Sequence, residues 1–166
     1  MRVHWRSYEL RPAGSPPIAP EYKARIEASR PRFAQSMKDE LGVDIVFGPF
    51  GIDSRPALVL GKYAEAQGVG DAFHIATLEA YWQRGEDISD RAVLGRLAAG
   101  AGLDPARIDA AIADPAMIDH VDADIAQARE YGLDGVPAVV LDNKYLVMGA
   151  QPYDTFANAV KRAQAG

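Results

Sequence analysis

Hydrophobic and polar residues follow two different periods in this chain, and the strand-type pattern is confined to its two ends. Residues 138–141 form a short apolar run rich in β-branched side chains, residues 142–144 are typical of a turn, and residues 145–148 form a second apolar run. After Gly149, apolar side chains recur at helical spacing, and Pro152 suits the first turn of that helix. The pattern predicts a β-hairpin followed by a closing helix.

The first ten residues show the other strand-type pattern. The alternating residues are Val3, Trp5, Ser7 and Glu9 on one side, and His4, Arg6, Tyr8 and Leu10 on the other. This alternation predicts a strand over residues 3–10 with two unlike faces. Four of the eleven prolines fall in residues 11–20, which predicts an extended loop after that strand.

Between these ends the apolar spacing is helical. A helix is predicted over residues 20–30, Pro31 is expected to break or restart it, and the helix that follows is expected to end at Gly42. The apolar stripe predicted to be buried on this second helix consists of Phe33, Met37 and Leu41.

Residues 54–131 predict a succession of helices, separated by residues that begin or end them. Ser54 and Ser89 are predicted N-caps, and the pairs Asp104-Pro105 and Asp114-Pro115 each combine a capping carboxylate with a proline at the first helical position. No repeat of fixed length occurs. The predicted fold class is α/β, with a small sheet and a large helical part.

Val136 and Pro137 stand at the head of the first hairpin strand. A proline cannot donate a hydrogen bond to a sheet, so it is confined to the start of a strand, an edge or a bulge. A cis bond would leave the amide and carbonyl of Val136 facing outward, where an extended peptide could add its own backbone hydrogen bonds. From these residues alone the trans form is favoured, because cis is the minority even among X–Pro bonds.

Three stretches of the sequence resemble the DsbA family, and specifically its FrnE-like branch. They are GLDGVPAVVLDNKYLVMGAQPYDTF near the C-terminus, VHWRSYELRP near the N-terminus and AYWQRGEDISD between them. The resemblance implies an incomplete thioredoxin-like sheet with an all-helical insertion subdomain. Residues 1–10 and 133–166 would form the thioredoxin-like part, and residues 20–131 the mostly helical insertion subdomain and connecting helices.

The resemblance also implies a binding edge. It makes the Val136–Pro137 bond cis and assigns Val136 and Pro137 to substrate binding, with a peptide or a glutathione-like molecule as the ligand. In the related isomerase and kappa-class glutathione transferase branch, the position of Asp53-Ser54-Arg55 presents polar residues to glutathione.

The family places a CxxC dithiol opposite the cis proline, whereas this chain contains no cysteine. The family order is strand, CxxC, helix and second strand, and this sequence opens at the second strand, so the difference is a deletion. Either Met1 is the genuine initiator or the start was assigned downstream of the true one. Thiol–disulfide exchange, the family's reaction, proceeds through a thiolate, so it is predicted to be absent here, with no catalytic residue and no cofactor assigned.

Three other functional classes stay open: a glutathione-dependent isomerase or transferase, a redox-inactive peptide-binding module, and a truncated gene product without a function of its own. A missing strand would leave a gap of about 10 Å in a thioredoxin-like sheet, which is two strand spacings. Since unpaired backbone groups are costly when buried, a symmetric partner is expected to cover the gap, and a homodimer is predicted.

Composition excludes several other classes. The chain has 166 residues, enough for one domain with a real core, and a net charge of −5, which argues against nucleic acid as a partner. No apolar run is long enough to span a membrane, and no secretory signal is evident, so a cytoplasmic location is expected. The three histidines lie far apart without further ligands at suitable spacing, so no metal site is predicted.

Overall fold

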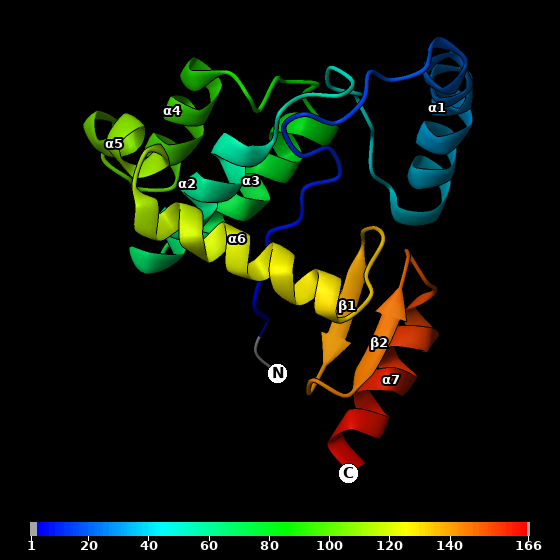
Figure 1. Cartoon of the computed structure of the whole chain (residues 1–166). Helices are drawn as coiled ribbons and strands as arrows, with labels where there is room; N and C mark the ends of the chain where they lie inside the picture. Colours follow the sequence, from blue (N-terminus) through cyan, green and yellow to red (C-terminus); the bar gives the residue numbers. More distant parts are fainter. Residues whose placement is uncertain (1–2, 166) are drawn as a thin grey trace. The chain divides into compact units, whose positions relative to one another are not determined.

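The computed structural model describes residues 3–165 (Figure 1). Its elements in chain order are α1 (Pro20–Leu41), α2 (Arg55–Ala66), α3 (Gly70–Trp82), α4 (Arg91–Gly100), the 3-10 helix η1 (Pro105–Arg107), α5 (Ile108–Ile112), α6 (Pro115–Glu130), β1 (Ala138–Leu141), β2 (Tyr145–Met148) and α7 (Tyr153–Ala165). The chain divides into two compact units, Met1–Asp122 and Ala123–Gly166. No helix in the described part is long and apolar enough to cross a membrane. The predicted grouping of residues 1–10 with residues 133–166 concerns how the two units meet, and it stays a prediction.

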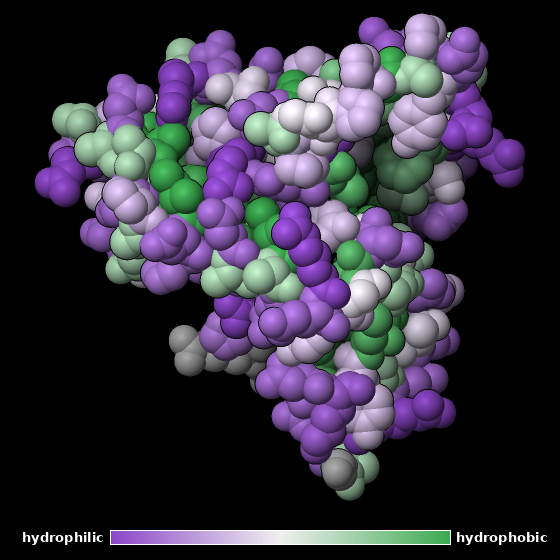
Figure 2. Space-filling model, viewed as in Figure 1, coloured by the Kyte–Doolittle hydropathy of each residue, from purple (hydrophilic) through white to green (hydrophobic). Residues whose placement is uncertain are grey.

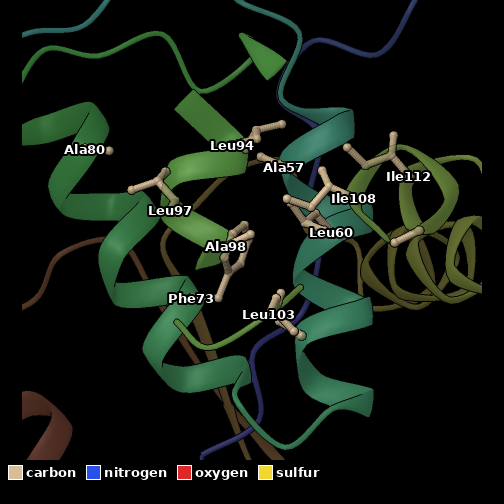
Figure 3. Packing of buried hydrophobic residues seen from close by; sticks show 12 residues of the cluster. Ala57, Leu60, Phe73, Ala80, Leu94, Leu97, Ala98, Leu103, Ile108 and Ile112 are labelled. Carbon is tan, nitrogen blue, oxygen red and sulfur yellow. The ribbon is translucent and has the colours of Figure 1, made fainter. Parts of the chain in front are cut away.

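The core of the first unit lies among α2, α3, α4 and α5 (Figure 3). Its buried residues are Ala57, Leu60, Ala64, Phe73, Ala80, Leu94, Leu97, Ala98, Leu103, Ile108, Ala111 and Ile112. Small alanines let the helix backbones approach closely, and the larger side chains fill the spaces between them. Phe73, from α3, is among the largest fully buried side chains. Burial of this apolar surface is the main stabilising contribution to the unit.

Aspartate side chains make the hydrogen bonds to the first backbone N–H groups of α2, α4, η1 and α6. Asp104 and Asp114 accept hydrogen bonds from the backbone N–H groups two residues further on, at 3.0 and 2.9 Å, which confirms both predicted caps. Ser54 occupies the predicted N-cap position of α2, but its side chain makes no capping hydrogen bond, and the cap predicted at Ser89 is wrong because Asp90 is the N-cap of α4. Before α2, Asp53 Oδ1 accepts from the N–H of Arg55 (2.9 Å), and before α4, Asp90 Oδ1 accepts from the N–H of Ala92 (2.7 Å). In both places a neighbouring carboxylate, a stronger acceptor than a hydroxyl, takes the unpaired helix N–H.

α1 is one continuous helix, so the predicted break at Pro31 is wrong. A proline inside a helix removes one backbone hydrogen bond, and because α1 has no buried residue the carbonyl left over lies near water. The predicted burial of Phe33, Met37 and Leu41 is wrong for the same reason. Phe33 instead makes a tilted contact with Phe47, at a ring-centroid distance of 6.1 Å. The predicted end at Gly42 is confirmed: this residue has φ 69° and donates its N–H to the carbonyl of Lys38 (3.0 Å).

Val3–Leu10 does not form the predicted strand. Among residues 3–165 the sheet consists of β1 and β2, and neither pairs with this segment. Side chains anchor it instead. The ring of Trp5 stacks on His74 with centroids 3.8 Å apart, and Trp5 Nε1–H donates to Asp71 Oδ1 (3.0 Å). An alternating pattern is compatible with a strand, but a strand forms only when another segment supplies backbone hydrogen bonds. The local sequence does not specify that segment.

The C-terminal part of this segment also contacts the helices. Ser7 is buried, the Glu9 side chain is 7% exposed, and the carbonyl of Trp5 accepts a hydrogen bond from Lys62 Nζ (3.2 Å). Lys62, on α2, is itself buried and also pairs with Glu65 (3.1 Å). Contacts of Trp5 with His74, Asp71 and Lys62, together with the ion pair of Glu9 with Arg55, therefore fix the segment to α2 and α3.

The second unit contains the predicted hairpin and closing helix, and both are confirmed. β1 and β2 are antiparallel, with Ala138 opposite Met148 and Leu141 opposite Tyr145. Two residues of the turn, Asp142 and Asn143, adopt positive φ angles of 51° and 52°, which Asp and Asn tolerate better than most residues. The N–H of Lys144 donates to the carbonyl of Leu141 (3.0 Å) and closes the turn. α7 packs along both strands.

Replacing Leu94 by alanine should lower the free energy of unfolding by about 2–5 kcal/mol, because this fully buried side chain would leave a cavity among α2, α3 and α4. The control is Leu78→Ala at a position on α3 that is 45% exposed, where a change within about 0.5 kcal/mol is expected. Urea unfolding followed by circular dichroism measures both. Equal losses in the two variants would contradict the assigned core.

His74 should make stability depend on pH. Burial lowers the pKa of His74, although the negative charges of Asp71 and Glu65 oppose the shift. The pKa of His74 is therefore lower in the folded protein than in the unfolded chain. As the pH falls through the ordinary value of about 6.5, the unfolded chain takes up a proton that the folded protein does not. The free energy of unfolding therefore decreases over this pH range. Between pH 7.5 and 5.5, His74→Gln should lose less stability than the wild type. The control is His120→Gln at an exposed position, which should lose as much stability over this pH range as the wild type does. If His74→Gln also lost as much as the wild type, the role assigned to His74 would be contradicted.

Candidate functional site

Pro137 stands at the entrance to β1 and fixes how the hairpin begins. The peptide bond between Val136 and Pro137 is cis. The carbonyl of Pro137 accepts a hydrogen bond from the N–H of Gly149 (2.8 Å), which extends the ladder by one pair beyond Ala138 and Met148. Pro137 has no N–H to donate in return, so the ladder ends at this pair.

This hydrogen bond determines which residues of β1 face away from β2. In an antiparallel ladder, hydrogen-bonded and non-hydrogen-bonded pairs alternate. Since Pro137 and Gly149 form a bonded pair, Val139 with Val147 and Leu141 with Tyr145 are bonded pairs as well. The N–H and carbonyl groups of Ala138 and Val140 therefore point outward. Neither residue makes another hydrogen bond within the described chain.

Val136 continues this row of unused backbone groups. Within residues 3–165 its N–H and carbonyl make no hydrogen bond, and the residue is 50% exposed. The sequence singled out Val136 and Pro137 but missed Ala138 and Val140. The direction of their backbone groups follows from the register with β2 and from the hydrogen bond between Gly149 and Pro137, which the sequence alone does not specify.

The two faces of the hairpin differ in burial. Val147 is buried, whereas the adjacent Leu146, whose side chain lies on the opposite face, is 46% exposed. Ala138, Val140 and Met148 share the face of Leu146, because the two members of a pair lie on one face and alternate residues repeat it. Figure 2 shows green, apolar atoms over the position of the hairpin, bordered by purple, hydrophilic atoms. An apolar surface thus lies beside the row of outward backbone groups.

Charged residues flank the edge at both ends. Asp134 precedes it, is exposed and forms no ion pair within the described residues. Asp142 follows it in the turn and lies 3.1 Å from Lys144 Nζ. The turn is also linked to the end of α6, since the Tyr131 hydroxyl donates to Asn143 Oδ1 (3.4 Å).

In the second set of predicted polar residues, Asp53 accepts a hydrogen bond at the start of α2 and Arg55 forms two ion pairs. Arg55 Nη1 lies 2.9 Å from Glu9 Oε1, and Arg55 Nη2 lies 2.6 Å from Asp122 Oδ1. The hydrogen bonds to Asp122 and Glu9 raise the pKa of the Arg55 guanidinium above its ordinary value. Two carboxylates therefore already occupy the group that would otherwise attract an anionic ligand.

No group of three or more side chains able to hold a metal ion occurs among the described residues. The three histidines lie apart, and His74 makes its ring contact with Trp5.

The model of the DSBA-like thioredoxin domain matches residues 1–161. The chain belongs to this family. The predicted recognition and the thioredoxin-like fold are thereby confirmed, and the FrnE-like branch is consistent with the match. Among curated proteins, YwbO of Bacillus subtilis (strain 168) is 25% identical over 169 residues, which cover 99% of this chain and 83% of YwbO.

Two solved structures extend the comparison of this DsbA-like chain. The "probable DsbA oxidoreductase" of Streptomyces coelicolor is 29% identical with a TM-score of 0.74; the match covers 86% of this chain and 62% of that one. This chain therefore spans less than two thirds of the Streptomyces protein. A 2-hydroxychromene-2-carboxylate isomerase is 21% identical with a TM-score of 0.72, over 89% of this chain and 71% of the isomerase. At that identity the likeness shows the fold alone.

Arg55→Met should lower the free energy of unfolding by about 1–3 kcal/mol, because Glu9, only 7% exposed, would keep a charge without a partner. Urea unfolding measures the loss, and the double variant Glu9→Gln/Arg55→Met should recover part of it. The control is Lys38→Met, whose partner Asp44 is well exposed, and no measurable change is expected there. A similarly small effect at Arg55 would contradict the structural role assigned to it.

Proposed function

We propose that this chain is a thioredoxin-fold binding module that holds an extended peptide segment at the Val136–Pro137 edge. The observation that carries the proposal is the exposed Val136, whose N–H and carbonyl make no hydrogen bond within the described residues. An extended peptide offers the complementary groups, one carbonyl and one N–H, at the same spacing. Pairing with such a segment would satisfy both groups of Val136.

The proposal includes the absence of thiol–disulfide exchange by the 166-residue chain itself. Such exchange begins with attack by a thiolate on a disulfide sulfur, and the chain has no cysteine to supply one. The family relationship supports binding at a thioredoxin-like fold, while the cysteine count supports binding without exchange. The two together favour a module that recognises a chain and does not oxidise or reduce it.

Binding is tested with the S-alkylated B chain of insulin, an unfolded peptide that has no free thiol. Titration into the ¹⁵N-labelled protein should shift the amide resonance of Val136. Val136→Pro, which removes the N–H, should weaken binding about two- to tenfold, because one hydrogen bond contributes about 0.5–1.5 kcal/mol. The control is Val3→Pro, at an N-terminal valine that is 56% exposed, and unchanged affinity is expected there.

Two further measurements complete the test. Insulin reduction in the presence of dithiothreitol should proceed at the rate of the dithiothreitol blank; acceleration that heat denaturation abolishes would overturn the redox part. Titration with reduced glutathione alone should leave Val136 unshifted. A shift with glutathione and none with the B chain would replace the peptide by a glutathione-like ligand.

A further inference from the structure

We infer that the first unit binds a free α-amino acid with an apolar side chain in a cavity between α2, α5 and the start of α6. The cavity has a volume of about 290 Å³, just below the range of about 300–1,000 Å³ that is usual for small-molecule sites. Its polar lining residues are Tyr63, Arg107 and Asp114, and its apolar ones include Ala110, Ala113 and Pro115. None of them belongs to the Val136–Pro137 edge, so this second site does not rest on the proposed function.

The core of the first unit fixes the elements around the cavity. α2 packs against α5 (Figure 1), and Ala64 and Ile112, which each follow a lining residue in sequence, belong to the buried cluster. All lining residues fall within residues 63–115, so the N-terminal segment and the second unit contribute none of them. The side chains of Ala110 and Ala113 are small and leave the space unfilled, so a ligand can occupy it without displacing the core.

Arg107 supplies a positive charge that has no partner. Among the described residues its guanidinium makes no ion pair and no hydrogen bond, whereas Arg55 and Arg96 are paired with carboxylates. A planar guanidinium binds a carboxylate through two parallel hydrogen bonds. Tyr63 adds a hydroxyl that likewise makes no hydrogen bond within the described residues, and a hydroxyl can donate to the same carboxylate. The cavity therefore has the groups that recognise a carboxylate.

Asp114 supplies a negative charge to the same cavity. Its Oδ1 accepts a hydrogen bond from the N–H of Ala116 (2.9 Å), and the carboxylate forms no ion pair among the described residues. A carboxylate accepts several hydrogen bonds, so the cap leaves capacity for an ammonium group. Arg107 and Asp114 line one cavity but do not pair with each other. A ligand that carries both charges would satisfy both residues at once.

The two opposite charges decide the class of ligand. A phosphate would be attracted by Arg107 but repelled by Asp114 and by the net charge of −5. A diamine would be repelled by Arg107 in turn. An α-amino acid carries one carboxylate and one ammonium group and has no net charge near neutral pH. An apolar side chain on it would be removed from water beside Ala110, Ala113 and Pro115.

The test titrates the ¹⁵N-labelled protein with L-leucine and with two compounds that each lack one of its charges. Isocaproate lacks the ammonium group, and isoamylamine lacks the carboxylate. L-Leucine should shift the amide resonances of Ala111 and Ala116, with a Kd on the order of a millimolar because the ligand is small. The other two compounds should each bind about two- to fivefold more weakly, since each loses one exposed ion pair. Equal affinity for all three, or larger shifts with inorganic phosphate, would overturn the amino acid as ligand.

The carboxylate contact is tested with Arg107→Met, which removes the charge and keeps most of the length of the side chain. L-Leucine should bind this variant about two- to fivefold more weakly than the wild type and no more tightly than isoamylamine does, because the carboxylate has lost its partner. The control is Arg162→Met, at an exposed arginine on α7 that also forms no ion pair among the described residues, and unchanged binding is expected there. Wild-type affinity in Arg107→Met would overturn the site.

The ammonium contact is tested with Asp114→Asn, which removes the charge and keeps a side chain that can cap α6. This variant should bind L-leucine about two- to fivefold more weakly and isocaproate no more weakly than the wild type does. The matched control is Asp104→Asn, because Asp104 caps η1 through the same kind of hydrogen bond (3.0 Å) and does not line the cavity. Equal losses of L-leucine binding in the two aspartate variants would overturn the ammonium contact.

Discussion

A backbone hydrogen bond from the N–H of Gly149 to the carbonyl of Pro137 determines which residues of β1 point their backbone groups toward β2 and which point them away. Hydrogen-bonded pairs alternate in an antiparallel ladder, so this single bond turns the groups of Val139 and Leu141 toward β2 and those of Ala138 and Val140 away from it. Pro137 occupies the one position where its missing N–H ends the ladder without interrupting it. The hairpin therefore keeps its internal bonds and still presents a continuous row of donors and acceptors.

That row matters because the chain belongs to a family related to DsbA and yet has no thiol. At the Val136–Pro137 edge, the backbone N–H and carbonyl groups of Val136, Ala138 and Val140 point away from β2 or make no hydrogen bond within the described residues. Backbone groups recognise extended chains of almost any sequence, and selectivity then depends on neighbouring side chains. Here those neighbours are an apolar face that includes Leu146 and a carboxylate at each end of the edge, at Asp134 and Asp142.

The first unit is held together by a different kind of interaction. Its alanine-rich core fixes α2 to α5, whereas the N-terminal segment is joined to that core by side chains. Arg55, at the start of α2, binds both Glu9 and Asp122, so one guanidinium connects three segments that are distant in sequence. Arg55 thus makes structural ion pairs, and the polar site for glutathione that the resemblance implies at Asp53-Ser54-Arg55 stays a prediction.

Local sequence determined the features whose causes are local. The hairpin, the closing helix, the aspartate caps at Asp104 and Asp114 and the helix end at Gly42 follow from turn chemistry, capping and glycine's access to positive φ. The family resemblance was likewise visible in short motifs. Each of these features depends on residues only a few positions apart, so the sequence contained what was needed.

Only the tertiary structure decided the features that depend on a distant partner. Val3–Leu10 alternates as a strand does, but no described strand pairs with it, and Trp5 and Glu9 fix it to helices instead. α1 has a helical apolar stripe, but none of its residues is buried, and Phe33 stays 44% exposed although it contacts Phe47 and Trp82. The outward row on β1 required the register with β2, which residue spacing along one strand does not specify. Strand pairing, burial and charge compensation each depend on contacts between segments that are distant in sequence. These contacts exist only in the folded protein.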